Sequence, residues 1–447
     1  MSVAYTLTKN VQEQALTSLK EWISIPSVLN ETSSKWPFGD EIQRMLELTL
    51  RTCEELGMTT YMDPEGYYGY AEIGEGTETM AILCHIDVVP AEDEAAWKFG
   101  PFTATIDEGK IYGRGTQDDK GPTIASLYAV KALVDAGEVF NKKIRFIFGT
   151  DEENLWRCMD KYNEKEPEAT YGFAPDSDFP LTYAEKGLLQ VKLHGPGSKD
   201  FQTHNDGAFN VVPDKAVYNE KEKVAEMKAL ADARGYSYLD QADELVLTGV
   251  SVHAKDAQDG VNAVVNLADL LKEHYEHEAL AFIADNFVND PHAKQIFGEV
   301  ADADSGALTA NIAKLLVTPD ESVVAIDLRL PVTADKEALV ADLKAAATKY
   351  GLEYEEYDYL RSLYVPLDHS LIQTLLEVYR GLTGDNSEPI SSGGATYART
   401  MNNCVAFGAR TVDVPMTAHQ VNENMPVKNF YEAMEIYAHA IKALTCD

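Results

Sequence analysis

Histidine and acidic residues follow three apolar runs that are typical of β-strands. The runs, each with the residues that come after it, are AILC with His85 and Asp87, IRFIFGT with Glu152 and Glu153, and YGFAP with Asp176. Functional sites of parallel α/β sheets lie beyond the carboxyl ends of the strands, so we expect these side chains to meet at one edge of a sheet. Two further candidates lie in loops, Asp118 in GRGTQDDKGP and His419 in PMTAHQVNEN.

Each candidate has a structural explanation when it is taken alone. The pair Asp118 and Asp119 is placed to cap the helix that follows it. The acidic pair after IRFIFGT is typical of solvated charge, and a single histidine such as His419 is more often structural than a ligand. His85 and Asp87 share one face of a strand, because strand side chains alternate with a period of two, and they fit either a structural pair or a ligand with its partner. Only the combination of all these residues indicates a metal site.

The expected site suits a pair of divalent cations. Carboxylate and imidazole donors without a thiolate favour Zn²⁺, with Mn²⁺ and Co²⁺ as alternatives. Three carboxylates and one hydroxide balance two such ions, and two neutral histidines complete a set of five ligands: His85, Asp118, Glu153, Asp176 and His419. Asp118 has two oxygens with which to bridge the ions. Metal-assisted hydrolysis also needs a base near the bound water, and Glu152 is the candidate.

The elements that must position these residues alternate between helix and strand. Apolar residues at helical spacing predict helices over 11–25, 40–56 and 121–136, the first two ended by Pro26 and Gly57. Short apolar runs predict strands over 80–84, 144–148 and 171–174. This alternation predicts an α/β domain with a mostly parallel sheet.

The middle of the chain has a different pattern of predicted helices and strands. Expected strands at 188–194, 244–253 and 322–330 alternate with helices such as 261–274 and 335–350, which is an α+β pattern. After Pro366 the helical patterns return, at 371–382, 395–402 and 429–444. We therefore predict a catalytic domain in two pieces, with an α+β lid domain inserted between them; the ranges are 1–187 and 367–447 for the catalytic domain and 188–366 for the lid.

Five strings of the sequence resemble, in this order, the motif series of a known enzyme family: CHIDVVP, GRGTQDDKGP, GTDEEN, GFAPDSDFP and TAHQVNEN. The family comprises the di-zinc metallopeptidases related to aminoacylase, carboxypeptidase G and carnosinase, and the chain is most similar to its bacterial PepV-type dipeptidases. The resemblance implies a phosphorylase/hydrolase-like catalytic domain with an inserted lid. It implies His85 and Asp176 on one ion, Glu153 and His419 on the other, and Asp118 between the two.

The resemblance also implies roles for residues outside the ligand set. In the catalytic domain, Asp87 would orient His85, and Glu152 would be the general base that activates the bridging water. The string SSGGATYAR resembles the loop that holds the terminal carboxylate of the substrate, where exposed amides at a helix start suit an anion. Its candidate residues are Gly394, Thr396 and Arg399.

Three residues of the predicted lid have counterparts in the family. His253, in TGVSVHAKDAQDGVNAV, would hydrogen-bond the carbonyl oxygen that becomes an oxyanion. Asn210 in GAFNVVP and Arg329 in IDLRLP would lie near the substrate. The lid is long, and in PepV-like enzymes an enlarged lid stands in for a partner subunit. We therefore expect a monomer.

The expected reaction is hydrolysis of dipeptides, and of some tripeptides, that have a free amino terminus. One alternative within the family is an N-acyl amino-acid deacylase or a succinyl-diaminopimelate-type amidase, which has the same metal site. A free ammonium needs a spare carboxylate, and Asp178 is the candidate for it. A second alternative is a metal-binding protein without activity, which the full set of five ligands disfavours.

Composition excludes several other classes of protein. The 447 residues carry a formal charge of −35, which disfavours nucleic acids and anionic membranes as partners. The N-terminal residues show no apolar segment typical of a signal peptide, and no apolar run approaches the length of a membrane-spanning helix. Five scattered cysteines without a CxxC spacing favour free thiols in a reducing compartment. We expect a cytoplasmic protein that acts on a small peptide.

Overall fold

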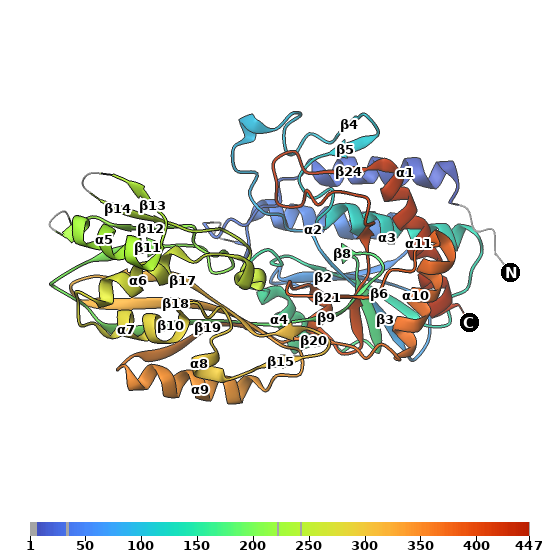
Figure 1. Ribbon diagram of the computed structural model, residues 1–447. Coiled ribbons are helices and arrows are strands. Elements are labelled where there is room, and N and C mark those ends of the chain that lie inside the picture. The colour runs from blue at the N-terminus through green and yellow to red at the C-terminus, as the bar shows by residue number, and fades with distance from the viewer. Residues whose placement is uncertain (1–6, 33–34, 221–222, 242–243, 447) are drawn as a thin grey trace. The chain divides into compact units, whose positions relative to one another are not determined.

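The computed structural model describes residues 7–32, 35–220, 223–241 and 244–446. The chain forms two compact units, whose elements are labelled in Figure 1. The first unit comprises 1–183, 364–390 and 396–447, and the second comprises 184–363 and 391–395. The short segment 391–395 thus belongs to the second unit, although the sequence pattern assigns it to the C-terminal piece of the catalytic domain.

The first unit is built on a mixed nine-stranded sheet. Its strands are β1 (Thr59–Met62), β2 (Tyr68–Ile73), β3 (Thr79–His85), β6 (Lys143–Gly149), β7 (Tyr171–Ala174), β9 (Thr182–Glu185), β20 (Leu363–Tyr364), β21 (Ile390–Ser392) and β22 (Cys404–Ala406). They follow the order β1-β2-β6-β3-β7-β22-β9-β20, and β21 pairs with β9. The four strands β6, β3, β7 and β22 are parallel, whereas the pairs β1–β2, β2–β6 and β22–β9 are antiparallel. The parallel arrangement expected for most of the sheet is therefore confined to its centre.

The central strands are buried because their sequences are apolar on both faces. β3 reads TMAILCH and β6 reads KIRFIFG, and in each strand only the first residue is partly exposed. Runs of this kind are typical of parallel strands that helices cover on both sides. The register pairs His85 with Gly149, the last residue of each strand. The loops that follow β3 and β6 therefore leave the sheet at the same edge.

Six α-helices accompany this sheet (Figure 1): α1 (Lys9–Ile23), α2 (Asp40–Glu55), α3 (Lys120–Asp135), α4 (Arg157–Lys165), α10 (Ser370–Thr383) and α11 (Val427–Thr445). Helix α3 packs against both α1 and α11, and α11 packs against α10 as well. This central place explains the sequence of α3, in which every residue from Lys120 to Val130 is buried. A helix that is buried all round lacks a polar face.

A small antiparallel sheet lies beside two loops that carry site candidates. Its strands are β4 (Thr105–Asp107), β5 (Lys110–Tyr112) and β24 (Asn424–Pro426), in the order β24-β5-β4. The register pairs Tyr112, the last residue of β5, with Asn424, the first residue of β24. The loop 113–119 and the loop 415–423 therefore adjoin the small sheet at the same end.

The second unit is an α+β structure. Its main sheet is antiparallel throughout and has the order β11-β17-β18-β10-β19, with bounds β10 (Gly187–Pro196), β11 (Thr203–Asp206), β17 (Thr309–Val317), β18 (Glu321–Leu330) and β19 (Glu353–Leu360). A three-stranded sheet, β12-β14-β13, consists of β12 (Lys215–Tyr218), β13 (Tyr238–Asp240) and β14 (Leu245–Thr248). The helices are α5 (Val224–Arg234), α6 (Ala263–Lys272), α7 (Glu278–Phe287), α8 (Lys294–Phe297) and α9 (Lys336–Lys349).

The second unit has a hydrophobic core of its own. Alternate residues of β10 enter it, namely Leu189, Val191 and Leu193, and so do residues of α6 and α7 such as Leu267 and Phe282. This alternation is typical of an antiparallel sheet that buries one face against helices.

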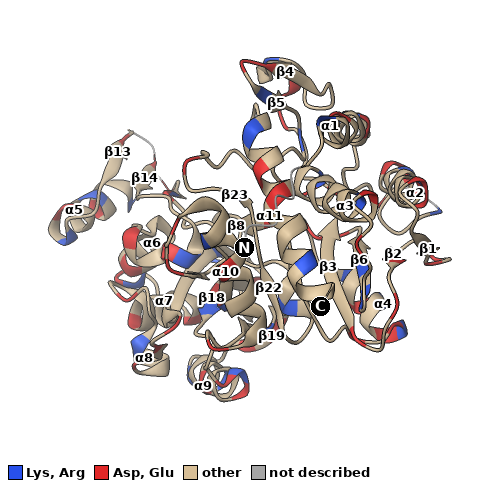
Figure 2. Ribbon diagram, turned by 90° about the vertical axis from the view of Figure 1, so that its right-hand side faces the viewer, with Lys and Arg blue, Asp and Glu red and all other residues tan. Residues whose placement is uncertain are grey.

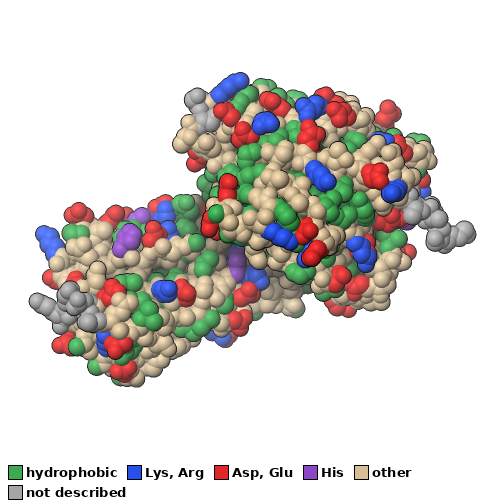
Figure 3. Space-filling model, turned by 90° about the horizontal axis from the view of Figure 1, so that it is seen from above, with side chains coloured by type: hydrophobic (Ala, Val, Ile, Leu, Met, Phe, Trp, Pro, Cys, Tyr) green, Lys and Arg blue, Asp and Glu red, His purple; other side chains and the backbone are tan. Residues whose placement is uncertain are grey.

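Charged residues of both signs lie on the outer surfaces. Figure 2 shows acidic and basic residues interspersed along α2 and α9, and Figure 3 shows side chains of both signs spread over the face seen from above. All five cysteines carry free thiols. Within the described ranges, the search for a helix with both the length and the apolar character of a membrane span found none.

Candidate metal centre

Five side chains of the first unit converge beyond the ends of the central strands. Their potential ligand atoms form two groups, and within each group all of these atoms lie within 4.8 Å of one another. The groups are His85, Asp118 and Asp176, and Asp118, Glu153 and His419. The two oxygens of Asp118 face different histidines: Oδ1 lies 2.8 Å from Nε2 of His85, and Oδ2 lies 2.9 Å from Nε2 of His419. Asp118 is therefore placed to bridge two cations.

The orientation of His85 is set by the main chain that follows it. Its Nδ1 lies 3.0 Å from the carbonyl oxygen of Asp87 and 3.6 Å from the carboxylate of the same residue. The carbonyl, and not the carboxylate suggested by the family resemblance, is therefore the hydrogen-bond acceptor. With a proton on Nδ1, the unprotonated Nε2 shares one space with the carboxylates of Asp118 and Asp176, whose Oδ2 is 3.7 Å away, and a cation in that space would satisfy all three groups. A histidine that ligates a metal is commonly held in this manner.

The carboxylate of Asp87 fixes the loop that follows β6 instead. One oxygen accepts the N–H of Glu152 and the other accepts the N–H of Glu153, each at 3.1 Å. Asp151, the first acid of the loop, is buried and forms an ion pair of 2.7 Å with Arg157. The three consecutive acids therefore have different surroundings, and Glu153 is the one whose carboxylate meets His419, at 3.0 Å.

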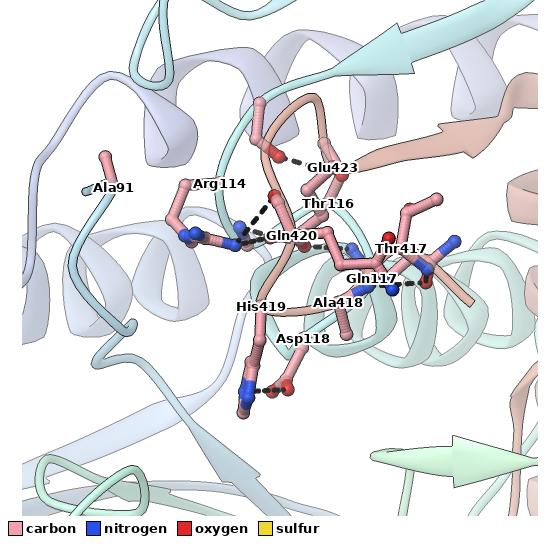
Figure 4. Close-up of polar contacts among 12 residues, drawn as sticks. Ala91, Arg114, Thr116, Gln117, Asp118, Thr417, Ala418, His419, Gln420 and Glu423 are labelled. Carbon is pink, nitrogen blue, oxygen red and sulfur yellow. Dashed lines mark hydrogen bonds and ion pairs between the residues drawn. The ribbon is translucent and has the colours of Figure 1, made fainter. Parts of the chain in front are cut away.

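The neighbouring residues Asp118 and Asp119 have different partners, and only one of them stands at the start of helix α3. Asp119 occupies the N-cap position of α3, without a side-chain capping bond. Its Oδ2 accepts the N–H of His85 at 3.1 Å and the hydroxyl of Thr123 at 2.9 Å, so it joins the start of α3 to the end of β3. Asp118 points toward His419 instead (Figure 4). Of the two aspartates offered as caps, Asp119 therefore takes the N-cap position and Asp118 does not.

Glu153 and Asp176 bind protons more readily than free carboxylates, whereas for Asp118 burial is outweighed by the hydrogen bonds of His419 and His85, which lower its pKa. Burial and the charge of Asp118 raise the pKa of Glu153 to about 7 and that of Asp176 to about 6. Burial alone lowers the pKa of His419, but the carboxylates of Asp118 and Glu153 outweigh it and raise the pKa to about 11. Like charges crowded into a buried site need positive charge nearby. The donor set thus fits divalent cations.

Glu152 adjoins the ligand set and is partly buried. Burial raises the pKa of its carboxyl well above the usual range, and Asp176, Glu153 and Asp118 shift it in the same direction. The indole N–H of Trp156 donates to the carbonyl of Glu152 at 2.6 Å and steadies the loop. A carboxylate with a raised pKa suits a general base that works near neutral pH.

Three candidates from the predicted lid lie in the second unit. Nδ1 of His253 accepts the N–H of Lys255 at 3.1 Å, so the neutral ring carries its proton on Nε2. The carbonyl of Asn210 accepts the N–H of Ala254 at 2.8 Å, which places Asn210 and His253 on adjacent segments. Desolvation and the charge of Arg329 lower the pKa of His253. Its imidazole is therefore neutral at neutral pH.

Arg329 is buried and already engaged within the second unit. Its guanidinium contacts both oxygens of Asp327, at 2.7 and 3.1 Å, and its Nη1 donates to the carbonyl of Gly393 at 2.9 Å. Arg329 therefore fixes the glycine turn that precedes Gly394. Contact between Arg329 and substrate stays a prediction.

The structure differs from expectation in the segment around SSGGATYAR. Instead of the helix expected over 395–402, the chain forms a single 3₁₀ turn, Tyr397–Thr400. The N–H of Ala398, in this turn, donates a hydrogen bond to the hydroxyl of Thr396. The N–H of Gly394 donates to Ser392 at 2.9 Å, and Arg399 is buried. The predicted helix is therefore wrong, and the role of Gly394, Thr396 and Arg399 in holding the terminal carboxylate of the substrate stays a prediction.

Asp178 is also paired, contrary to its expected role as a spare carboxylate. Its Oδ2 lies 2.6 Å from Nη2 of Arg410. Parallel pairing of Ser177–Asp178 with Ala409–Arg410 brings the two side chains together. A substrate ammonium would have to compete with this guanidinium, and binding of the ammonium by Asp178 stays a prediction.

The comparisons with known proteins agree with the motif series. Residues 81–443 match peptidase family M20/M25/M40. This chain belongs to that family. A relative from Bacillus subtilis (strain 168), named "Putative dipeptidase YtjP", is 34% identical over 457 residues, which cover 97% of each chain. The M20 chain described here is thus a peptidase, and the family to which it belongs is metal-dependent.

Solved structures share the fold of this M20 peptidase. Human carnosine dipeptidase 1 superposes with a TM-score of 0.61 and 18% identity, over 97% of this chain and 96% of that one. The dipeptidase Dug1p from Saccharomyces cerevisiae gives a TM-score of 0.63 and 16% identity, again over 97% and 96%. The fold is therefore that of the M20 peptidases, an α/β catalytic domain with a second α+β domain.

Sequence reasoning overlooked three residues beside the M20 ligand set: Arg114, Gln117 and Glu423. Arg114 and Gln117 lie in the string GRGTQDDKGP, and Glu423 lies in TAHQVNEN. In these strings, only Asp118 and His419 are predicted to have a function. Their burial is the signal in the structure that distinguishes them, since a charged pair is seldom buried without a purpose.

Proposed function

We propose that this M20 peptidase is a dipeptidase that hydrolyses dipeptides, and some tripeptides, with a free amino terminus. The observation that carries the proposal is the pair of ligand groups that share Asp118, with Glu152 beside them. The names of the similar proteins, "Putative dipeptidase YtjP" among them, support the choice of substrate.

Two divalent ions would be held by the five ligands, with His85 and Asp176 on one ion, Glu153 and His419 on the other, and Asp118 bridging. Zn²⁺ suits these oxygen and nitrogen donors best, and Mn²⁺ and Co²⁺ are alternatives. When bound, such ions polarise a peptide carbonyl and lower the pKa of water.

Glu152 is proposed to carry the proton of the reaction. Its carboxylate takes a proton from the attacking water, and the resulting carboxylic acid gives that proton to the leaving amine. Asp87 holds the main chain of Glu152 in place for both transfers. The raised pKa of Glu152 favours the first transfer, because a more basic carboxylate takes the proton of the water more readily.

His253 is proposed to stabilise the developing negative charge on the carbonyl oxygen. Because Lys255 N–H occupies Nδ1, the Nε2–H group is the donor that His253 can offer. A preset donor of this kind acts without reorganisation during the reaction. His253→Gln, which retains a donor N–H, is expected to keep more activity than His253→Ala.

The test is a kinetic comparison of wild-type protein with Glu152→Gln. We expect kcat on Leu-Gly to fall by about 10²–10⁴-fold, the usual contribution of a general base. Metal content, measured by mass spectrometry, should stay at the wild-type value because the five ligands are intact. Turnover of the variant close to that of the wild type would show that Glu152 is not the base.

The same assay separates the dipeptidase from an amidase of the family. Wild-type protein is offered Leu-Gly and β-Ala-His on one side and N-acetyl-methionine on the other. A dipeptidase turns over the first two and leaves the third. Preference for N-acetyl-methionine would assign the protein to deacylation.

We also propose that the protein is monomeric and cytoplasmic. Support for the location comes from five cysteines that all remain free thiols. Support for the monomer comes from the size of the second unit, residues 184–363 and 391–395. Analytical ultracentrifugation at micromolar concentration should show one species of 49.3 kDa, and a stable dimer would contradict the proposal.

A further inference from the structure

Side chains outside the ligand set join the two loops that carry Asp118 and His419 (Figure 4). We propose that Gln117 and Glu423 are positioning residues, which fix Asp118 and His419 relative to each other and thereby set the affinity for the ion of the Asp118–Glu153–His419 group. The inference rests on the proposed metal site, since it assigns a task to residues beside that site. The paired residues and their backbone partners are here called the loop clasp.

Gln117, from the first loop, binds the main chain of the second. Its Oε1 accepts the N–H groups of Thr417 at 2.8 Å and Ala418 at 3.1 Å. Its Nε2 donates to the carbonyls of Pro415 at 3.0 Å and Asn424 at 2.8 Å. All four hydrogen bonds that a glutamine amide can make are therefore made to one loop, the loop of His419.

Glu423, from the second loop, binds the main chain of the first in return. Its Oε1 accepts the N–H groups of Gly115 at 3.1 Å and Gln117 at 2.8 Å. Its Oε2 is 2.8 Å from Nη1 of Arg114, and both side chains of this ion pair are almost fully buried. The N–H of Gly113 also donates to the carbonyl of Glu423, at 3.0 Å. Each loop is thus held by a side chain of the other.

The loop clasp grips the main chain on both sides of His419. Gln117 binds the N–H of Ala418, and Nη1 of Arg114 lies 3.4 Å from the carbonyl of Gln420. Between these two contacts, His419 itself adopts a left-handed conformation, with φ of 63°. A residue other than glycine keeps such a conformation where its surroundings determine it.

The location of the clasp makes its effect larger on one ion than on the other. Gln117 directly precedes Asp118, and the residues it binds directly precede His419. His85 and Asp176 are held by other elements, at the ends of β3 and β7. Loosening the clasp therefore disturbs the Asp118–Glu153–His419 group more than the group that contains His85.

The test measures the affinity of the metal-depleted protein for Zn²⁺, by competition with a chromophoric chelator. Gln117→Leu removes the amide and keeps the approximate size of the side chain. We expect two ions to bind to wild-type protein, and one of them to bind about 10- to 100-fold more weakly to Gln117→Leu, the usual effect of losing a partner behind the ligands. The second ion should keep its affinity within about threefold, because Asp118 is the one member of its ligand group that adjoins the clasp, whereas the first ion loses the support of both Asp118 and His419.

A matched control is Gln43→Leu. Gln43 is another buried glutamine of the first unit, in α2, where its Nε2 contacts Glu47. Its substitution should leave both affinities at wild-type values. An excess of Zn²⁺ should also restore kcat of Gln117→Leu, because the five ligands remain. If Gln117→Leu does not fold, Glu423→Gln tests the same point, since it keeps the shape of the side chain and removes the charge that pairs with Arg114.

The outcomes separate this inference from the function on which it rests. Wild-type protein that binds no ions overturns the proposed metal site and the positioning role together. Two ions in wild-type protein, with unchanged affinities in the variant, overturn the positioning role alone. Equal weakening of both ions overturns it as well, since the clasp would then act on the fold in general.

Discussion

The carboxylate of Asp87 holds Glu152 through the main chain, with Oδ1 accepting the N–H of Glu152 at 3.1 Å. Asp87 thus holds the proposed base by its main chain, and this hydrogen bond does not involve the carboxylate of Glu152. Asp87 stands two residues after His85, so one short segment serves both a ligand and the base.

Substitution of Asp87 by asparagine should therefore impair chemistry more than folding. In Asp87→Asn one of the two acceptors becomes an NH₂ group that faces an N–H, so the loop after β6 loses an anchor. We expect kcat to fall by about 10- to 100-fold. Steady-state kinetics on Leu-Gly measure the effect. The control is Asp63→Asn, another buried aspartate, which binds Lys165 and the N–H of Tyr67. Equal losses in both variants would contradict the role of Asp87.

Removal of metal should abolish activity and lower stability together. Because ions bind the folded site and not the unfolded chain, saturation at about 100 times Kd adds about 2.7 kcal/mol per site. We expect chelated protein to be inactive, to melt at lower temperature, and to recover both properties on addition of Zn²⁺, Mn²⁺ or Co²⁺. Calorimetry and the dipeptide assay follow the two properties. Full turnover after complete chelation would end the metal hypothesis.

Two glycines in helices should respond in opposite ways to alanine. A Cβ on Gly121, in the first turn of α3, would come closer than 3.0 Å to the carbonyl oxygen of Thr116, in the loop of Asp118. A Cβ on Gly381, in α10, would meet nothing within 4 Å. Gly121→Ala should lower both stability and Zn²⁺ affinity, whereas Gly381→Ala should stabilise the protein by roughly 0.5–1 kcal/mol. Urea unfolding and metal titration test the pair. A Gly121→Ala protein with unaltered metal affinity would show that the loop tolerates the shift.

His277 should make the stability of the protein depend on pH. Its Nδ1 caps α7 by accepting the N–H of Ala279 at 3.2 Å, and its Nε2 lies 3.1 Å from the carbonyl of Pro196. Burial lowers the pKa of His277, and the smaller effect of Glu278 opposes that shift. The unfolded chain then binds the proton more readily than the folded one, with a pKa of about 6.5. The contribution of His277 is present above that value and is lost as the pH falls through the lower folded pKa.

The variant His277→Asn separates this histidine from the other acid-sensitive groups. Asparagine retains an oxygen that can cap the helix and does not titrate. Thermal unfolding between pH 8 and pH 5 should show a smaller loss of stability for the variant than for the wild type. Parallel curves would exclude His277 as the source.

Helices with a clear amphipathic face could be predicted closely from the sequence. The expected 40–56 is Asp40–Glu55, and 371–382 is Ser370–Thr383. The strand expected over 244–253 is shorter, because β14 ends at Thr248 and the chain then turns back to pair at Val250 and Val261. The hairpin of β1 and β2 escaped prediction, since its short strands have no continuous apolar run.

The ligand candidates could be predicted because each follows a strand or sits in a motif, and the strand ends meet by the rules of parallel sheets. The loop clasp could not be, since Gln117 and Glu423 are polar residues about 300 positions apart whose pairing depends on the register of β5 with β24. The burial of Arg399 could not be predicted either, because its neighbours in the chain show no apolar residues at a regular spacing.

Strand β22 lies between β7 and β9, although Cys404–Ala406 is made long after both of its neighbours. His419 and Glu423 follow it. During translation, a nascent chain thus has a gap in the middle of its main sheet until Cys404–Ala406 is made, and it lacks the last of the five candidate ligands until His419 is made.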